Sequence, residues 1–486
     1  MDLNTLPVTE LARRVQHGEV SAEDVAKATL VAIKNGESLG AYLETAEASL
    51  LDAARAIDAK RARGETLGPL AGVPVGVKDV LCTKGLGTAC ASKILVQNGV
   101  RWAPPYDATV VARLRAADAM IPGKCNMDEF AMGSSNENSA FFPARNPHDP
   151  TRAPGGSSGG SAVSVAAKMT PASLGTDTGG SVRQPAAFTG VVGVKPTYGR
   201  VSRYGLIAFA SSLDVVGPFA SDVRGAARVT QVIAGHDPHD ATSVDRPVDD
   251  LEAACDRDLS GLRIGVPSEY FAEGIQPIVE QRVREALASL EKAGAKLVPI
   301  SLPHTKYAVA VYYVLATAEA SSNLSRFDGV RFGLREPGKD LAAMYEATRG
   351  QGFGVEVQRR IILGTYVLSH GYYDAYYLKA QRVRTLVKRD FDEAFTKVDV
   401  IAAPTAPTVA FKLGEQIDDP LTMYLNDVYT LPASLAGLPA VSVPTAPAPA
   451  EGDRPPLPIG LQLVGPAFEE GRVFGVAAAW ERLRDA

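Results

Sequence analysis

Cysteine is scarce in this sequence, and no two cysteines are closely spaced. Cys82, Cys90, Cys125 and Cys255 are spread over 486 residues and form no Cys-x-x-Cys pair. This number and spacing exclude a disulfide framework and a cysteine-rich zinc site. We therefore expect the protein to occupy a reducing compartment.

Long hydrophobic runs and an excess of positive charge are also missing. No run of eighteen apolar residues occurs, and the N-terminus contains acidic residues without an apolar core of signal-peptide length. We therefore expect a cytoplasmic protein with no membrane association. Fifty basic and fifty-five acidic residues give a net charge of −5, which excludes an overall basic field for nucleic acid. Any RNA contact would be local or made by another chain.

The composition is that of a globular protein, with 46% apolar and 22% charged residues. Hydrophobic periodicity predicts one large α/β unit built around a mixed sheet. Ser21 is expected to cap the first of the main helices, with Asp24 three residues on. Helices are expected at 21–34, 44–62, 278–293 and 467–483, and strands at 73–77, 262–267, 295–302, 398–405 and 457–465. The proline-rich segment 444–458 is expected to be a surface loop.

A glycine- and serine-rich stretch, "APGGSSGGSAVS", occupies residues 153–164. Residues 155–159 match the G-x-S-x-G nucleophile elbow, which requires a buried strand before it. The preceding "ARNPHDPTRAP" cannot form a central strand, so the elbow interpretation fails. A phosphate-binding loop is also disfavoured, because no G-K-[ST] follows.

A second glycine-rich loop lies within "ASLGTDTGGSVRQPAAF" at 172–188. The sequence predicts a short strand before Ser181 and a helical turn after it, so that backbone N–H groups converge at this serine. Acyl transfer needs such donors for its oxyanion. A tight turn that requires glycine is the simpler interpretation of the loop on its own.

A reactive serine needs a base. The six histidines lie outside both loops and in no recognisable catalytic context, although a distant histidine could fold into the site. A buried lysine with a lowered pKa is the other known partner. Lys78 in "VPVGVKD" is the candidate, on the opposite face of its strand from Val73, Val75 and Val77. An isolated lysine on a strand is more commonly a solvated charge.

Together, Lys78, "GGSSGGS" (155–161) and "DTGGSVRQP" (177–185) resemble the amidase signature family in order and spacing, most specifically over residues 70–220. The resemblance implies the amidase signature fold, a large mixed sheet with helices on both faces. It also implies one domain over 1–486, with a helical N-terminal segment to about 65 and a signature core at about 66–220, while the remainder completes the sheet and the substrate pocket.

The same resemblance implies a Ser-cisSer-Lys triad. Ser181 would be the nucleophile, Lys78 the base, and Ser157, after a cis peptide bond, the relay between them. Ser158 would support the relay. The oxyanion hole would be formed by the backbone N–H groups of Thr178, Gly179, Gly180 and Ser181.

Four further stretches, at 126–141, 194–214, 319–333 and 371–386, resemble the glutaminase subunits of tRNA-dependent amidotransferases. Such a glutaminase is the amidohydrolase component of a ligase. Its ammonia passes to a B subunit, which uses ATP and magnesium and makes most contacts with aminoacylated tRNA. A small C subunit completes the heterotrimer, which amidates Glu-tRNA(Gln), Asp-tRNA(Asn) or both. The resemblance implies no metal or organic cofactor on this chain.

A glutaminase needs a cation for the α-carboxylate of glutamine and an anion for its α-ammonium. The resemblance implies Arg360 in "VQRRIILG" and Asp427 in "YLNDVYTLPAS" for these roles, and Tyr312 or Tyr313 in the pocket lining. It does not separate Arg359 from Arg360, and an arginine here is equally a helix-surface charge. The basic helix at 377–390 is expected to be a solvated face.

Two other functions are compatible with the same residues. One is a stand-alone amidase that acts on other carboxamides. The other is a non-enzymatic protein whose glycine-serine loops form an anion-binding nest.

Overall fold

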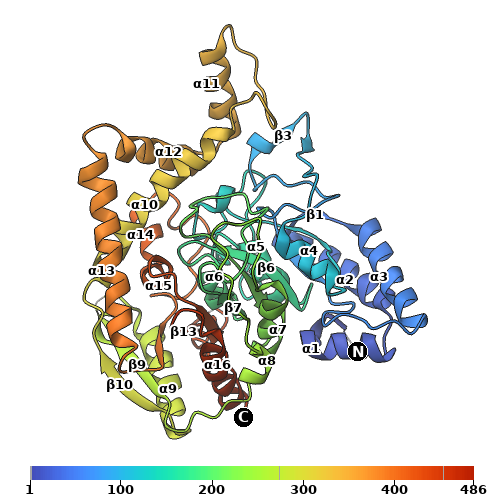
Figure 1. Cartoon of the computed structure of the whole chain (residues 1–486), viewed down its shortest axis with the longest axis vertical. Helices are drawn as coiled ribbons and strands as arrows, with labels where there is room; N and C mark the ends of the chain where they lie inside the picture. Colours follow the sequence, from blue (N-terminus) through green and yellow to red (C-terminus); the bar gives the residue numbers. More distant parts are fainter. Residues whose placement is uncertain (1–2, 273, 453) are drawn as a thin grey trace.

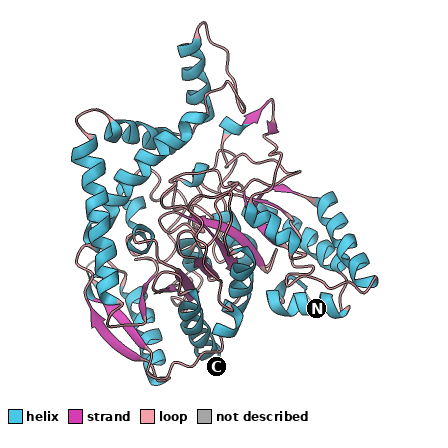
Figure 2. Ribbon diagram, viewed as in Figure 1, coloured by secondary structure: helices cyan, strands magenta, loops and turns pink. Residues whose placement is uncertain are grey.

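An eleven-stranded mixed sheet forms the centre of the fold (Figures 1 and 2). The computed structural model describes residues 3–272, 274–452 and 454–486. The strand order is β1-β5-β2-β6-β8-β7-β12-β13-β11-β9-β10, and β3 and β4 form a separate hairpin. The strands are β1 (Tyr42–Thr45), β2 (Val75–Lys78), β3 (Val96–Gln97), β4 (Val100–Arg101), β5 (Gly123–Cys125), β6 (Ala172–Asp177), β7 (Val192–Lys195), β8 (Val215–Ala220), β9 (Arg263–Pro267), β10 (Lys296–Ile300), β11 (Val400–Pro404), β12 (Ala440–Pro444) and β13 (Gly460–Val464).

Helices cover both faces of this sheet, as the sequence predicts. The α-helices are α1 (Val8–His17), α2 (Ala22–Asn35), α3 (Glu47–Ala62), α4 (Thr109–Ala116), α5 (Gly159–Ala166), α6 (Arg183–Thr189), α7 (Val223–Ile233), α8 (Leu251–Ala254), α9 (Pro277–Lys292), α10 (Ala308–Asn323), α11 (Leu341–Gly352), α12 (Val355–Leu368), α13 (Lys379–Ala394), α14 (Pro420–Leu425), α15 (Leu431–Leu435) and α16 (Glu470–Asp485). Phe219 of β8 packs against α5 and α6. Helix α7 also contacts β8 and packs against α16 (Figure 1).

Short helices connect several of these elements. They are η1 (Leu3–Thr5), η2 (Glu37–Leu39), η3 (Lys93–Leu95), η4 (Glu129–Ala131), η5 (Ser268–Phe271), η6 (Thr305–Tyr307), η7 (Leu324–Arg326) and η8 (Tyr373–Leu378), the last of which is a π-helix. The basic segment at 377–390 therefore begins in η8 and continues in α13. On the surface of α13, Lys388 pairs with Asp392 four residues on.

Most elements predicted from periodicity are present. Ser21 caps α2 by accepting a hydrogen bond from the Asp24 N–H at 3.0 Å. The predicted helix at 44–62 is wrong at its start, because Tyr42–Thr45 pairs with β5 and the helix begins only at Glu47. The proline-rich segment after β12 is a loop in its described part, as predicted.

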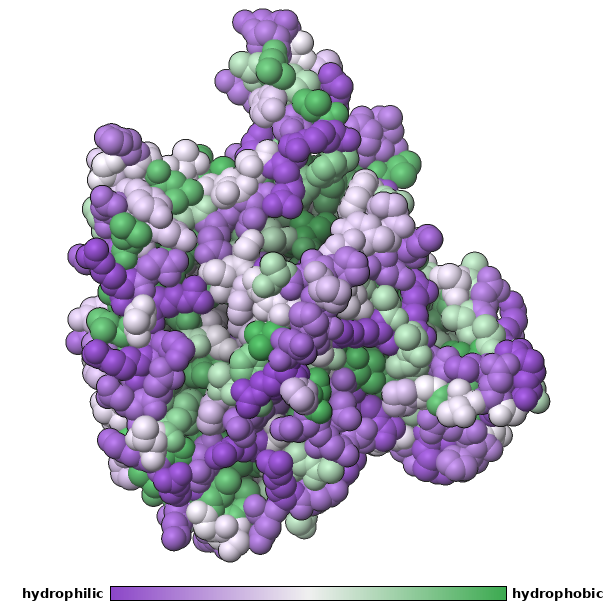
Figure 3. Space-filling model, in the orientation of Figure 1, coloured by the Kyte–Doolittle hydropathy of each residue, from purple (hydrophilic) through white to green (hydrophobic). Residues whose placement is uncertain are grey.

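The N-terminal helices form a small core of their own beside the sheet. Leu11, Val15, Val25, Leu50 and Ile57 are buried together between α1, α2 and α3. Figure 1 shows these helices in blue at the right of the molecule, while α10 and α12 lie at the opposite side. In Figure 3, a hollow with hydrophobic side chains opens at the base of the α11 projection.

The sheet register brings the two predicted site segments together. Strands β2 and β6 are parallel neighbours, with Val77 opposite Leu174. Parallel strands end at the same edge of a sheet. Lys78, the last residue of β2, therefore lies beside the second half of β6. This edge is covered by the two glycine-rich loops.

Candidate active site

Lys78 lies beneath both glycine-rich loops and is fully buried. Its Nζ atom is 2.8 Å from Ser157 Oγ, 2.7 Å from Ser158 Oγ and 2.8 Å from Thr176 Oγ1. Three hydroxyl groups therefore surround the amine, and no histidine in the described residues contacts it. The alternative of a solvated strand charge is wrong for this lysine.

Burial is the main influence on the charge of Lys78. Removal from water lowers the pKa of the amine from 10.5 to about 7, and Asp128, Asp177 and Asp214 oppose that shift. A lysine with this pKa is neutral in a large fraction of molecules at neutral pH. A neutral amine has a lone pair, so it can accept a proton from the Ser157 hydroxyl.

The loop that carries Ser157 approaches its neighbours more closely than side chains at its glycines would permit. The Gly156–Ser157 peptide bond is cis. A Cβ atom on Gly156 would lie 2.1 Å from Asp128 Oδ2. Among the hydrogen bonds that hold the loop, the Gly156 N–H donates to Gln184 Oε1 at 3.0 Å and the Asp128 N–H donates to the Ser157 carbonyl at 3.1 Å.

Ser181 follows β6 and stands just before α6, as predicted. It is 8% exposed, and its carbonyl accepts a hydrogen bond from the Ser158 N–H at 3.2 Å, which joins the two loops. Its hydroxyl makes no hydrogen bond with any residue that the structure describes, Ser157 included. In an enzyme without substrate, catalytic hydrogen bonds are often long or unformed.

The loop before Ser181 presents its backbone rather than side chains. Thr178 is turned away, with its hydroxyl donating to Asp214 Oδ1 at 2.7 Å. A Cβ atom on Gly179 would lie 2.9 Å from Tyr312 Cζ, and one on Gly180 would lie 2.2 Å from Thr430 Oγ1. Both glycines are needed because the chain passes so close to these side chains.

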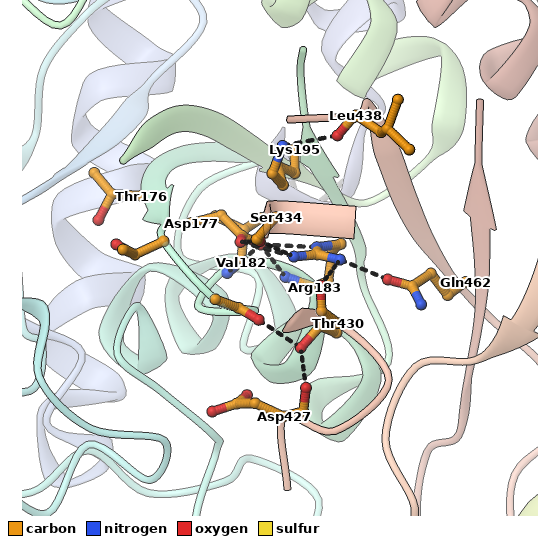
Figure 4. Close-up of polar contacts among 12 residues, drawn as sticks. Thr176, Asp177, Val182, Arg183, Lys195, Asp427, Thr430, Ser434, Leu438 and Gln462 are labelled. Atoms are coloured by element: carbon orange, nitrogen blue, oxygen red, sulfur yellow. Dashed lines mark hydrogen bonds and ion pairs between the residues drawn. The ribbon is translucent and has the colours of Figure 1, made fainter. Parts of the chain in front are cut away.

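A buried ion pair holds this loop from behind (Figure 4). Arg183 donates to both carboxylate oxygens of Asp177 at 2.9 Å, and neither side chain is exposed. The remaining Arg183 donors reach Gln462 Oε1 at 2.6 Å, the Thr430 carbonyl at 2.9 Å and Ser434 Oγ at 2.8 Å. The guanidinium therefore ties the Ser181 loop to segments near the end of the chain.

The structure distinguishes between the two arginines of α12. Arg359 is 39% exposed, whereas Arg360 is 3% exposed. Arg360 Nε donates to Glu356 Oε1 at 2.8 Å, and its Nη1 and Nη2 atoms make no hydrogen bond with a described residue. The guanidinium carbon lies 5.2 to 5.5 Å from the ring centroids of Phe209, Tyr313 and Tyr424. Arg359 is the helix-surface charge, and Arg360 is a buried cation with two free donors.

Asp427 is a buried carboxylate with one unused oxygen. Its Oδ2 atom accepts from Ser134 Oγ at 2.5 Å, while Oδ1 has no hydrogen-bond partner among the described residues. Burial raises the pKa of this carboxyl to about 7. Oδ1 lies next to Gly180, since a Cβ atom there would be 2.9 Å away. A cationic ligand group would satisfy the orphaned oxygen.

The two tyrosines of α10 occupy different places. Tyr312 packs on Gly179, at the loop that precedes Ser181. Tyr313 stacks on Tyr424 with ring centroids 3.7 Å apart and lies beside Arg360. Tyr424 in turn donates to Glu356 Oε1 at 2.9 Å. Tyr312 thus borders the serine loop, and Tyr313 supports the arginine.

Several polar residues of the site were not predicted from the sequence. They are Ser134, Thr176, Gln184, Asp214, Glu356, Tyr424 and Thr430. For Glu356, the spacing of four residues from Arg360 on one helix was an available signal. The others reach the site through contacts between distant segments, for which local patterns give no signal.

Neither a metal site nor a membrane span is present in residues 3–272, 274–452 and 454–486. No group of three or more histidine, cysteine, aspartate or glutamate side chains in these ranges is arranged to hold a metal ion. No helix there combines the length and the apolar character that a membrane span requires.

The sequence is similar to known proteins over nearly its whole length. Residues 24–474 match the model of the amidase family. The chain is 56% identical to the A subunit of the glutamyl-tRNA(Gln) amidotransferase of Moorella thermoacetica, over 99% of this chain and 97% of that protein. It is 58% identical to the protein of the same name from Roseiflexus castenholzii, over 99% and 96%.

Solved structures give the same picture. The crystal structure of the A subunit of the glutamyl-tRNA(Gln) amidotransferase from Thermotoga maritima superposes with a TM-score of 0.80 at 44% identity, covering 98% of this chain and 94% of that one. A bacterial aryl acylamidase of the amidase signature family shares the fold, with a TM-score of 0.85 at 23% identity over 98% and 96% of the two chains.

Proposed function

The chain belongs to the amidase family, and on this premise we propose that it is the glutaminase component of a tRNA-dependent amidotransferase. It would hydrolyse glutamine to glutamate and ammonia. Three relatives that are 54–58% identical over nearly the whole chain are named as A subunits of glutamyl-tRNA(Gln) amidotransferases, which supports this choice over other amidase activities.

The observation that carries the chemistry is the contact between the buried Lys78 amine and the Ser157 hydroxyl at 2.8 Å. An amine with a pKa of about 7 is partly neutral at neutral pH and can accept a proton, and Ser157 stands in the loop that is hydrogen-bonded to Ser181. In the proposed reaction, Ser181 Oγ attacks the side-chain carbonyl carbon of glutamine. Its proton passes to Ser157 Oγ, and the proton of Ser157 passes to Lys78.

The negative charge of the tetrahedral intermediate falls on the former carbonyl oxygen. The N–H groups of the loop from Thr178 to Ser181 are the proposed donors to this oxygen. The proton held by Lys78 returns through Ser157 to the amide nitrogen, the carbon–nitrogen bond breaks and ammonia leaves. Water then attacks the glutamyl ester of Ser181, with the same relay as its base, and glutamate is released.

The free polar groups of the site suit the zwitterionic end of glutamine. Arg360 has two unused donors for the α-carboxylate, and Asp427 Oδ1 is an unused acceptor for the α-ammonium. Tyr312 would line the pocket beside Gly179. Ser158 would hold the Lys78 amine in place, through their contact at 2.7 Å.

Ammonia released here would be used by a partner. A B subunit with ATP and magnesium would amidate Glu-tRNA(Gln), Asp-tRNA(Asn) or both, and would make most contacts with the tRNA. A C subunit would complete a heterotrimer. No cofactor is assigned to this chain.

Replacement Ser181→Ala tests the proposal. The variant complex should lose glutamine hydrolysis and glutamine-driven amidation, while amidation driven by added ammonia persists. Ser212→Ala is the control, because Ser212 bonds to Glu319 outside the site. Residual glutaminase activity in Ser181→Ala would exclude this nucleophile. If the chain without partner subunits turned over simple carboxamides as fast as glutamine, a stand-alone amidase would be favoured instead. Failure of Ser181 to react with an alkyl fluorophosphonate would favour a binding protein.

A further inference from the structure

Thr430 contacts both halves of the proposed site. It is fully buried, and its Oγ1 atom lies 2.7 Å from the Gly179 carbonyl and 3.0 Å from the Asp427 carbonyl. Its single hydroxyl proton is directed at these two oxygens, and the shorter contact is to Gly179. Within the described residues, this is the sole hydrogen bond to the Gly179 carbonyl.

This contact determines the direction of a backbone N–H group. The Gly179 carbonyl and the Gly180 N–H belong to one planar trans peptide unit and point in opposite directions. A hydrogen bond that fixes the carbonyl therefore fixes the N–H. That N–H is one of the proposed oxyanion donors, whose contribution depends on alignment. Two successive glycines would otherwise allow this peptide unit a wider range of orientations.

The same threonine is tied to the turn that carries Asp427. The Thr430 N–H donates to the Asp427 carbonyl at 3.0 Å. Asp427 Oδ1, the free acceptor of the site, lies against Gly180. The ammonium subsite and the Gly180 peptide unit are therefore set relative to each other by one residue, as Figure 4 shows for Thr430 and Asp427.

The backbone of Thr430 is held independently of its hydroxyl. Its carbonyl accepts from Arg183 Nη1 at 2.9 Å, and Arg183 is locked by its ion pair with Asp177. Loss of the Thr430 hydroxyl should therefore leave the segment in place and release only the Gly179–Gly180 peptide unit.

We propose that Thr430 is a positioning residue, which holds the Gly180 N–H in register with the ammonium subsite at Asp427. The assignment of these two subsites rests on the proposed function. A substrate with a free α-ammonium group on Asp427 would then present its amide carbonyl to a donor that is already aligned. This favours amides of α-amino acids over simple carboxamides.

The test compares Thr430→Val, which keeps the shape and removes the hydroxyl, with Thr430→Ser, which keeps the hydroxyl. Thr430→Val should lower kcat for glutamine in the complex by about 10- to 100-fold and change KM by less than about threefold, because a misdirected donor affects mainly the transition state. Thr430→Ser should stay within about threefold of wild type. Thr445→Val is the matched control, since within the described residues this buried hydroxyl bonds to the Ala446 and Ile459 carbonyls, away from the site.

The rate of Ser181 labelling by an alkyl fluorophosphonate is measured in parallel, because it needs the oxyanion donors but not glutamine. Slower labelling in Thr430→Val, with rescue in Thr430→Ser, supports the inference. It does so even if the wild type fails to hydrolyse glutamine, because that failure would count against the proposed function alone. Wild-type kcat and labelling in Thr430→Val would overturn the inference. Equal losses in the Val and Ser variants would also overturn it, because they would indicate a packing role only.

Discussion

The amino group of Lys78 lies 2.8 Å from the hydroxyl oxygen of Ser157, and neither side chain is exposed to solvent. No carboxylate forms an ion pair with the lysine in the described structure, and its three close partners are hydroxyl groups. Hydroxyl groups stabilise an ammonium ion less than a carboxylate does, so burial dominates the pKa of this amine.

The pH dependence of acylation should follow the charge of Lys78. The pKa of this lysine is lowered to about 7, and only its neutral form can act as a base. The rate of Ser181 labelling by a fluorophosphonate should therefore rise with pH to a plateau above about pH 7, and fall about tenfold per pH unit below it. Stopped-flow or gel-based labelling across pH 5–9 measures this profile.

Asp427 also has a pKa of about 7. The fluorophosphonate carries no ammonium group to bind Asp427, so the pH dependence of its labelling rate should not report the titration of Asp427. The variant Asp427→Asn should keep the same inflection. A labelling rate that is flat between pH 5 and 8 would contradict the assignment of Lys78 as the base.

Replacement Arg360→Lys should weaken the binding of glutamine. Lysine keeps a positive charge beside Glu356 but lacks the two parallel donors that pair with a carboxylate. We expect KM for glutamine to rise about 10- to 100-fold with kcat little changed, from the loss of a charge-assisted hydrogen bond. Arg359→Lys is the matched control one residue away, on the exposed side of α12. Steady-state kinetics that show equal effects for both variants would refute the assignment.

Replacement Arg183→Met should destabilise the fold. It leaves the Asp177 carboxylate buried and unpaired, which costs about 3–5 kcal/mol in comparable buried pairs. The midpoint of urea unfolding should fall accordingly. Arg263→Met removes an exposed pair with Asp399 and should lower the urea midpoint far less, because water screens this pair. The double variant Arg183→Met/Asp177→Asn should recover part of the loss, and no recovery would mean that the unpaired charge is not the cause.

Local patterns were sufficient to predict the elements that carry Lys78, Ser157 and Ser181. Alternating valines predicted the strand of Lys78, and glycines beside serines predicted the loops of Ser157 and Ser181. The burial of Lys78 was not predictable from that alternation, because β2 lies between β5 and β6 and both of its faces are covered. An alternating pattern marks one buried face and does not show what covers the other.

The distinction between Arg359 and Arg360 was within reach of the sequence. Val357, Arg360, Gly364 and Val367 share the buried side of α12, at the spacing of an amphipathic helix. The role of Thr430 had no such signal. Its partner Asp427 lies in the same turn, but Gly179 lies about 250 residues earlier in the chain, and only the tertiary fold brings it to Thr430.

Strands β12 and β13 join the sheet between β7 and β11, although they are the last strands of the chain. Gln462 of β13 bonds to Arg183, and Thr430 bonds to Gly179. Both contacts lie beside Ser181, which is synthesised much earlier. During translation, the first two hundred residues contain Lys78, Ser157 and Ser181 but lack Thr430, Ser434 and Gln462, which hold Gly179 and Arg183 of the second loop. A nascent chain should therefore have no amidase activity until its C-terminal third has folded, so that a partly made protein would not consume glutamine.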